Sequence, residues 1–315
     1  MRETSSLRVN FLRRACAGVL TLWAAVTFVF FALRLTAGDP TASLLSQGLA
    51  SQQQADALRR SLGLDSPLPV QYLRFLVGLG RGELGRSLYT QREVAATIGE
   101  QAGPTLRLAL AGLLVAVVVG GSLGVAAGAL PDSAFGRAAA SLAGLATAIP
   151  AALTGVLVLW AATSLARSAP SLLPLTRSDS LLLPALALGV ASSGALARVI
   201  QSGLEDNRDA PYLLAARARG VRQGPRLIWH SLRPVLPLAI SFLALEAALL
   251  LGGTVVTETV FARPGLGRLL VSSILIGDFP VVQGLVLLAA VIYTLTHVVA
   301  DSLSAVIDPR LRTSV

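Results

Sequence analysis

Long runs of apolar residues without charge constrain this chain more than any other feature of its sequence. A stretch of about 18 or more such residues is long enough to cross the hydrocarbon core of a bilayer as a helix. Five stretches meet this condition: 15–33, 108–130, 138–166, 180–197 and 280–300. A sixth, 235–257, carries one carboxylate, Glu246, at its centre. Charged residues make up only 14 % of the chain, against about 25 % in a soluble domain. The sequence therefore predicts an all-α integral membrane protein with six transmembrane helices.

The first of these stretches is expected to be a retained membrane helix. Arg8, Arg13 and Arg14 precede it, as positive charges precede the core of a signal peptide. Its apolar core, however, is longer than the usual length of about 7 to 15 residues, and no A-x-A-like cleavage site follows it. Cys16, the only cysteine in the sequence, lies within this helix. One cysteine excludes an internal disulfide and a cysteine metal cluster.

The basic residues of the chain are all arginine, since the sequence contains no lysine. A nucleotide-binding P-loop requires a lysine, so the chain cannot be a conventional ATPase by itself. With the N-terminus inside, the cytoplasmic segments 1–14, 131–137, 205–233 and 301–315 hold 13 arginines, whereas the two short outer loops hold 4. The positive-inside rule therefore predicts that both termini are cytoplasmic, and the outer segment 36–103 is long enough to be translocated regardless of its charge.

The outer segment is predicted to contain two short helices. Ser51 followed by Gln54 forms a capping box for a helix through Arg60, and Gly63 is a suitable stop signal. Pro67 and Pro69 then begin a second, amphipathic helix, whose apolar face holds Val70, Leu73, Leu76 and Val77. Two compatible functions follow from this pattern: a small cap packed on the membrane domain, and a docking surface for an extracytoplasmic partner.

Small residues and prolines inside the spans predict how the helices pack and bend. Gly120, Gly124 and Gly128 recur every four residues in the second span, and such a face allows close contact with another helix. Pro150 and Pro184 fall within the third and fourth spans, where proline can kink a helix. We interpret both prolines as static bends and not as hinges.

Residues 205–233, between the fourth and fifth spans, form a connection too long for a plain turn. The pattern over 211–219 is helical, and Gly220 is expected to end that helix. A second short helical pattern runs over 225–230. A loop that only set the orientation of the chain in the membrane would not need two helices, so this segment is predicted to be a structured contact surface.

The sequence of this loop, YLLAARARGVRQGPRLIWHSLRPVLP (residues 212–237), resembles the cytoplasmic EAA loop of ABC-importer permeases. The form is that of the dipeptide/oligopeptide/nickel subfamily, Y-x-x-x-A-R-A-[KR]-G followed by H-x-L-R. Further segments resemble this subfamily in the same order along the chain, and those before the second span are similar to its B-type subunit. They are GDP (38–40), LGLDSPLPVQYLRFL (62–76), GRGELGRSL (80–88), TETVFARPGLGRLL (257–270), DFPVVQGLVLL (278–288) and DPRLR (308–312).

Two positions depart from the pattern. Leu214 stands where the generic motif has its glutamate, a departure that is common in the subfamily. Pro234 follows H-x-L-R where asparagine is more usual, and this proline is expected to shorten the second helix of the loop.

The resemblance implies a type I ABC-importer permease. Its organisation would be a cytoplasmic N-terminus with the first helix (1–35), an extracytoplasmic segment with short helices (36–103), a transmembrane domain with helices 2–6 (94–305) and a cytoplasmic tail (306–315). It would lie in a prokaryotic inner membrane and pair with a similar but distinct second permease. Two cytosolic ATPases and an extracytoplasmic substrate-binding protein would complete the importer. The chain itself would bind no cofactor or metal and no nucleic acid and would not be an enzyme, since the ATPases use the ATP and magnesium.

The resemblance also assigns candidate residues. Those expected to couple the chain to the ATPases are Tyr212, Leu214, Ala215, Ala216, Arg217, Ala218, Arg219, Gly220, His230 and Arg233. Arginines in this set can form charge-assisted hydrogen bonds to carboxylates of a partner. Glu246 and Glu258 are the candidates for the translocation pathway. For Glu246 three roles compete: a residue lining the cavity, a packing residue, and a direct ligand for a cationic group of the substrate.

Several functions compete at the level of the sequence. Di- and oligopeptides are the expected cargo, with nickel chelates, opines or sugars as alternatives carried by the same architecture. A channel or ion-coupled transporter would need more ionisable groups in the membrane than Glu246 provides. A membrane enzyme is disfavoured because the chain has only two histidines, His230 in the loop and His297 in the last span. His297 is interpreted as a packed or interfacial residue.

Overall fold

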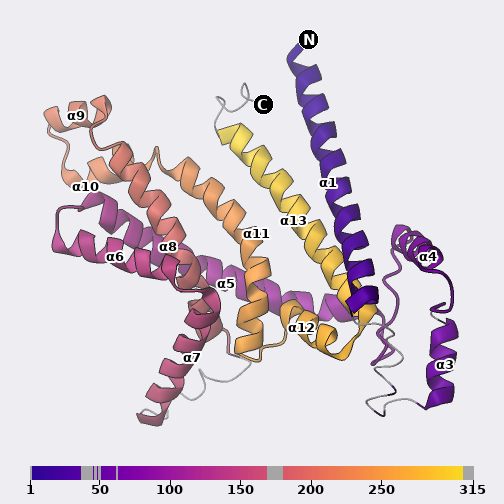
Figure 1. Cartoon of the computed structure of the whole chain (residues 1–315). Coiled ribbons are helices and arrows are strands. Elements are labelled where there is room, and N and C mark those ends of the chain that lie inside the picture. The colour runs from indigo at the N-terminus through magenta and orange to yellow at the C-terminus, as the bar shows by residue number, and fades with distance from the viewer. Residues whose placement is uncertain are drawn as a thin grey trace. The chain divides into compact units, whose positions relative to one another are not determined.

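The computed structural model describes residues 2–36, 45, 48, 51–61, 63–168 and 180–307. Over these residues the chain is helical and contains no β-strand (Figure 1), which confirms the all-α prediction. The helices are α1 (Arg2–Thr36), α3 (Gln52–Ser61), α4 (Leu68–Gly80), α5 (Val94–Ala129), α6 (Ala134–Ala148), α7 (Ala151–Ser168), α8 (Leu182–Asp206), α9 (Pro211–Ala218), α10 (Gln223–Arg226), the π-helix η2 (Leu227–Leu232), α11 (Leu236–Val260), α12 (Leu266–Ile276) and α13 (Phe279–Ile307). The predicted tail 306–315 lies outside the described residues from residue 308 onward.

Within this described part of the chain, five helices are long and apolar enough to cross a membrane, and a bent pair brings the number to six. The five are Ala17–Leu35, Val94–Ala129, Ala151–Ser168, Leu182–Asp206 and Phe279–Thr296. The bent pair joins Gly224–Leu232 to Leu236–Ala247 at an angle of 65°. These helices correspond in order to the six spans expected from the sequence.

The third span differs from its prediction. Residues 138–166 were expected to form one bent helix, but α6 ends at Ala148 and α7 begins at Ala151. Ile149 is extended, with φ −82° and ψ 122°, because the ring of Pro150 disfavours helical geometry in the residue before it. Pro184 does not bend the fourth span, because it lies in the first turn of α8. In the first turn its missing N–H removes no intrahelical hydrogen bond.

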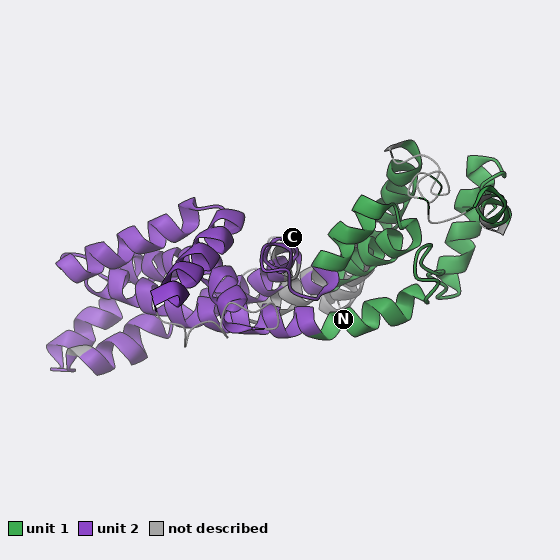
Figure 2. Ribbon diagram, turned by 90° about the horizontal axis from the view of Figure 1, so that it is seen from below, with its two compact units in different colours: residues 1–103, 268–295 green, residues 104–267, 296–315 purple. Residues whose placement is uncertain are grey.

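The chain divides into two compact units (Figure 2), residues 1–103 with 268–295 and residues 104–267 with 296–315. In the second unit α8 is the most buried of the candidate spans. Its residues Leu196, Ile200 and Leu204 form a core with Val235 and Ala239, which lie at and just after the start of α11. α8 is therefore joined by apolar packing to the helix that follows the 205–233 loop.

The glycine face of α5 packs directly against α8 in the same unit. A Cβ atom added at Gly120 would lie 2.5 Å from the carbonyl oxygen of Ser193, and one added at Gly124 would lie 2.6 Å from that of Ala197. Added at Gly128, it would lie 2.8 Å from Cβ of Leu204. The predicted close approach through small residues is thus confirmed.

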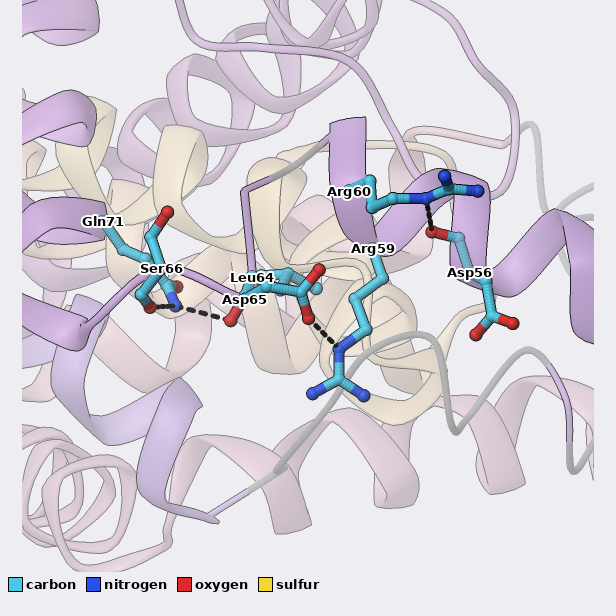
Figure 3. Close-up of polar contacts among 7 residues, drawn as sticks. All are labelled: Asp56, Arg59, Arg60, Leu64, Asp65, Ser66 and Gln71. Carbon is cyan, nitrogen blue, oxygen red and sulfur yellow. Dashed lines mark hydrogen bonds and ion pairs between the residues drawn. The ribbon is translucent and has the colours of Figure 1, made fainter.

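In the first unit, the two predicted outer helices are present as α3 and α4. The Ser51 amide donates to Oε1 of Gln54 (2.8 Å) and the Gln54 amide donates to Oγ of Ser51 (3.3 Å), which completes the capping box. Gly63 has φ +63° and ends α3 as expected. The corner that follows is closed by polar contacts (Figure 3): Arg59 pairs with Asp65 at 2.8 Å, and Nε2 of Gln71 donates to the carbonyl oxygens of Leu64 and Ser66.

α4 packs on α1 through aromatic rings. The ring of Phe75 stacks on that of Phe30 with centroids 5.4 Å apart, and the Tyr72 ring lies 5.3 Å from Phe30 and 5.5 Å from Phe31. The Tyr72 hydroxyl is 2.6 Å from Oγ1 of Thr27. Of the predicted apolar face only Leu76 is half-buried. Val70, Leu73 and Val77 lie on the side away from these contacts and are 41 %, 65 % and 49 % exposed.

A buried carboxylate ties the chain before α5 to the connection between α12 and α13. Asp278 accepts hydrogen bonds from Oγ of Ser87 (2.5 Å) and from the amide of Leu88 (3.1 Å). The Tyr89 hydroxyl donates to the carbonyl oxygen of Ile276. Asp278 is only 3 % exposed, so these partners satisfy a charge or polar group that would otherwise be costly to bury.

Candidate functional site: an exposed helix on an anchored loop

The first helix of the loop begins and ends at residues suited to those positions. Pro211 begins α9 after an extended Ala210, because its fixed φ suits the first helical turn and its missing N–H would have no intrahelical acceptor. At the other end Gly220 has φ +78°. The amide of Gly220 donates to the carbonyl of Arg217 and that of Val221 donates to Ala216, which is the Schellman pattern. The helix stop predicted at Gly220 is confirmed.

α9 has one buried side and one exposed side. Leu213 and Ala216, three residues apart, are 8 % and 0 % exposed and anchor the helix to its own unit. Ala216 therefore lies on the anchored side of α9, and its assignment as a coupling residue stays a prediction. The remaining candidates on this helix and at its end are exposed, namely Tyr212, Leu214, Ala215, Arg217, Ala218, Arg219 and Gly220.

The second half of the loop is helical, as predicted, but begins earlier and winds differently. α10 covers Gln223–Arg226 and continues as the π-helix Leu227–Leu232. His230 is half-buried, and its Nδ1 has no hydrogen-bond partner among the described residues. Arg233 is exposed. Two large apolar residues, Ile228 and Trp229, are 56 % and 66 % exposed; sequence reasoning missed them, although a tryptophan between arginines is an unusual pattern for a solvated loop.

The loop carries strong positive charge around a small cavity. A cavity of about 250 Å³ is lined by residues of α9 and of the neighbouring helices, and Arg208, Arg217 and Arg226 are its charged lining residues. Arg208 pairs with Asp132 at 2.8 Å, and this hydrogen bond and charge raise the pKa of the Arg208 guanidinium above its usual value. Arginines at a loop surface can receive carboxylates of another protein, so this surface suits an acidic partner.

Glu258, a candidate for the pathway, lies fully buried near the end of α11. Oγ1 of Thr105 donates to one carboxylate oxygen (2.6 Å) and the amide of Gly267 donates to the other (2.8 Å). Thr105 Oγ1 also accepts from the amide of Leu266 (2.8 Å). Leu266 and Gly267 begin α12, whose first amides have no acceptor within their own helix. Glu258 and Thr105 thus cap α12 from two other helices, and a carboxylate suits a helix N-terminus.

Glu246, the second pathway candidate, lies twelve residues earlier on α11 in a different environment. Its side chain is half-buried, and no hydrogen bond to it is present among the described residues. The structure therefore separates the two glutamates, since one is engaged in a buried network and the other is accessible near the middle of a span. His297 lies on α13, and its side chain is outside the described residues.

The sequence of this chain is similar to those of known membrane transport proteins. Residues 104–313 match the family described as binding-protein-dependent transport system inner membrane component, and residues 8–109 match the N-terminal family of the same systems' membrane components. A putative peptide permease protein of Brucella suis is 34 % identical, over 96 % of this chain and 98 % of that protein. The glutathione transport system permease protein GsiC of Salmonella paratyphi A is 33 % identical, over 96 % and 99 % of the two chains.

A putative peptide transport system permease protein of Brucella abortus is 35 % identical, again over 96 % of this chain and 98 % of the relative. The matched regions include the whole loop with α9 and the glutamate network at α12. The family match and the apolar helices together show that the chain is a multi-pass membrane protein. The chain belongs to the family of binding-protein-dependent transport system inner membrane components, as an ABC-importer permease of the dipeptide/oligopeptide type.

Proposed function

We propose that this chain is one permease half of an ATP-driven importer of di- or oligopeptides, with both termini in the cytoplasm of a prokaryotic cell. A second, similar permease forms the other half of the pathway, two cytosolic ATPases bind the loops, and an extracytoplasmic binding protein delivers the substrate. The ATPases bind the ATP and magnesium, and the chain catalyses no reaction alone. The observation that carries this proposal is α9, a short helix that is anchored on one side and exposed on the other.

Force applied to α9 would reach the membrane helices through the rest of the loop: α9 contacts α10 and η2, and η2 leads into α11. Leu213 and Ala216, on the inner side of α9, are buried. Side-chain packing as well as the chain connections at its two ends therefore holds α9 in its unit. The packed cluster of Leu204 with Val235 joins the end of α8 to the start of α11. Movement of α9 by closing ATPases would therefore displace α8 and α11 together, which is how nucleotide hydrolysis would reach the pathway.

The cargo is proposed from the relatives. Those compared are a glutathione permease and putative peptide permeases, and glutathione is itself a short peptide. Nickel chelates, opines and sugars remain alternative cargo for the same architecture. Uptake of labelled dipeptides by cells that express the complete transport system tests the proposed class, and accumulation of one of the alternatives without dipeptide uptake would replace it.

We expect Gly220→Leu to weaken binding of the ATPases. Gly220 has φ +78°, a conformation that costs a residue with a side chain about 1–2 kcal/mol, so the end of α9 will unwind or shift. If the whole penalty is expressed in docking, co-purification of ATPase with the permease should fall roughly fivefold to thirtyfold. Both the amount of ATPase recovered per permease and dipeptide uptake are measured.

Gly224→Leu is the matched control for this test. Gly224 lies in the same loop without a positive φ, and a Cβ atom there would have no neighbour within 4 Å. The control is expected to bind ATPase as the native chain does. Native-level ATPase recovery for Gly220→Leu would contradict the assignment of this loop as the docking element.

We expect Glu246→Gln to reduce transport of cationic peptides selectively. A charged carboxylate at mid-membrane costs about 2.5–3.5 kcal/mol on insertion scales, so a half-buried glutamate without a hydrogen-bond partner in the described chain suits a water-accessible cavity. The variant should assemble and hydrolyse ATP normally. Uptake of an arginine-containing dipeptide is compared with uptake of dialanine. An equal change in the uptake of both peptides would contradict an electrostatic role for Glu246.

A further inference from the structure

The second outer helix, α4, leaves an apolar row uncovered. Val70, Leu73 and Val77 follow one another at intervals of three and four residues, which places them on one side of a helix, and each is at least 41 % exposed. Together with Arg74 and Arg81 they line a shallow groove of about 550 Å³. Exposed apolar surface of this kind on a helix normally faces a protein or a membrane.

The opposite side of α4 places the helix at a definite level on α1. Tyr72 and Phe75 contact Phe30, which lies five residues before Leu35, the end of the apolar span Ala17–Leu35. At the rise of an α-helix, five residues correspond to about 8 Å. That distance falls in the depth of about 5–10 Å at which interfacial amphipathic helices bury their apolar faces.

The direction of α4 and the exposed apolar residues of α1 are both consistent with a position of α4 at the membrane interface. Figure 1 shows α4 nearly end-on while α1 runs in the plane of the picture, so the two helices cross. A helix seen nearly end-on beside a spanning helix that lies in the plane of the view runs along the membrane surface and not across the bilayer. On α1 itself Trp23, Phe28 and Leu35 are 51 %, 75 % and 77 % exposed, so α1 also presents apolar surface that suits lipid.

The charges of α4 complement phospholipid. Arg74 and Arg81 are exposed beside the apolar row, and neither is in an ion pair in the described chain. α4 contains no acidic residue; Glu83, beyond its end, also lines the groove and leaves the lining with a net positive charge. Arginine on the rim of an apolar helix face reaches lipid phosphate while its stem stays in the apolar layer.

We propose that α4 is an interfacial helix whose row of Val70, Leu73 and Val77 contacts lipid acyl chains while Arg74 and Arg81 contact phospholipid phosphate. This inference goes beyond the importer function and rests on it only for the leaflet, which is the outer one when both termini are cytoplasmic. Its consequence is that this side of α4 faces the bilayer and is closed to the binding protein.

Fluorescent labelling tests the proposal in the complete transporter. A single cysteine replaces Leu73 or, separately, Val77 in a Cys16→Ser background, and each is labelled with an environment-sensitive fluorophore in nanodiscs of phosphatidylcholine and phosphatidylglycerol. Lipids with a doxyl group near the head of the acyl chain should quench the emission at either position, as expected for shallow burial. Aqueous iodide should quench little.

A label at Gln53, which is exposed on α3, is the control and should show the opposite pattern. The proposal is overturned if labels at Leu73 and Val77 respond to iodide as the label at Gln53 does. It is also overturned, in favour of a protein interface, if those labels escape doxyl quenching and lose iodide access only when binding protein is added. Neither readout depends on ATPase docking, so failure here is distinct from failure of the proposed function.

Discussion

Replacement of Glu258 by leucine should prevent the permease from folding stably, although leucine is the more apolar residue and position 258 lies near the end of an apolar helix. The carboxylate accepts hydrogen bonds from Thr105 and from the amide of Gly267 in a site with no exposure. Each buried donor left without an acceptor costs about 1–3 kcal/mol. The first turn of α12 also loses the negative charge near its N-terminus. The measured quantity is the thermal midpoint of the monodisperse, detergent-solubilised permease pair.

The isosteric Glu258→Gln is expected to fail almost as severely. Both oxygens of the glutamate act as acceptors, and an amide would present its NH₂ group to one of the two donors. Thr105→Ser should leave the thermal midpoint unchanged, because the hydroxyl that donates to Glu258 and accepts from Leu266 is kept. Thr105→Val, of similar shape but without the hydroxyl, should lower the midpoint.

Glu246→Leu, on the same helix, is the control for folding. Its side chain makes no hydrogen bond within the described part of the chain, so the midpoint of this variant should stay close to that of the native pair. If Glu258→Leu and Glu246→Leu have the same midpoint, the buried network does not stabilise the fold. In that case Glu258 would return to consideration as a pathway residue only.

Gly124→Leu should likewise disrupt the membrane domain, through sterics. A Cβ atom at this position would lie 2.6 Å from the carbonyl oxygen and 3.0 Å from Cα of Ala197, and the backbone of α8 cannot yield as a flexible side chain could. Overpacking a tight interface typically costs about 1–3 kcal/mol, and a leucine adds three further carbons. We expect a large loss of the monodisperse permease pair after extraction.

Gly121→Leu, three residues earlier on α5, separates this steric effect from the chemistry of the change. A Cβ atom at Gly121 meets no neighbour within 4 Å, and leucine is a better helix former than glycine by roughly 1 kcal/mol. The yield of this variant should equal or exceed that of the native chain. Similar losses for both variants would show that α5 and α8 do not pack through this face.

Features that depend on a few neighbouring residues could be predicted from the sequence. The capping box at Ser51 and the helix stops at Gly63 and Gly220 follow from local hydrogen bonding and from the φ angles that only glycine adopts cheaply. The six apolar stretches follow from the need to satisfy backbone groups inside a bilayer. The glycine face of α5 could be recognised as a contact face, though the sequence did not name α8 as its partner.

Features that depend on segments far apart in the chain were decided by tertiary structure. The sequence identifies α9 as a short amphipathic helix, but the burial of Ala216 depends on what packs beneath it. It also identifies the apolar face of α4, yet the aromatic rings of α1 bind the other side and leave Val70 and Leu73 exposed. From the sequence, Glu258 is only an acidic residue near the end of an apolar stretch. The fold brings Thr105, 153 positions away, into hydrogen-bond contact with its carboxylate. Periodicity specifies which side chains share a face, whereas the partner of that face depends on long-range packing.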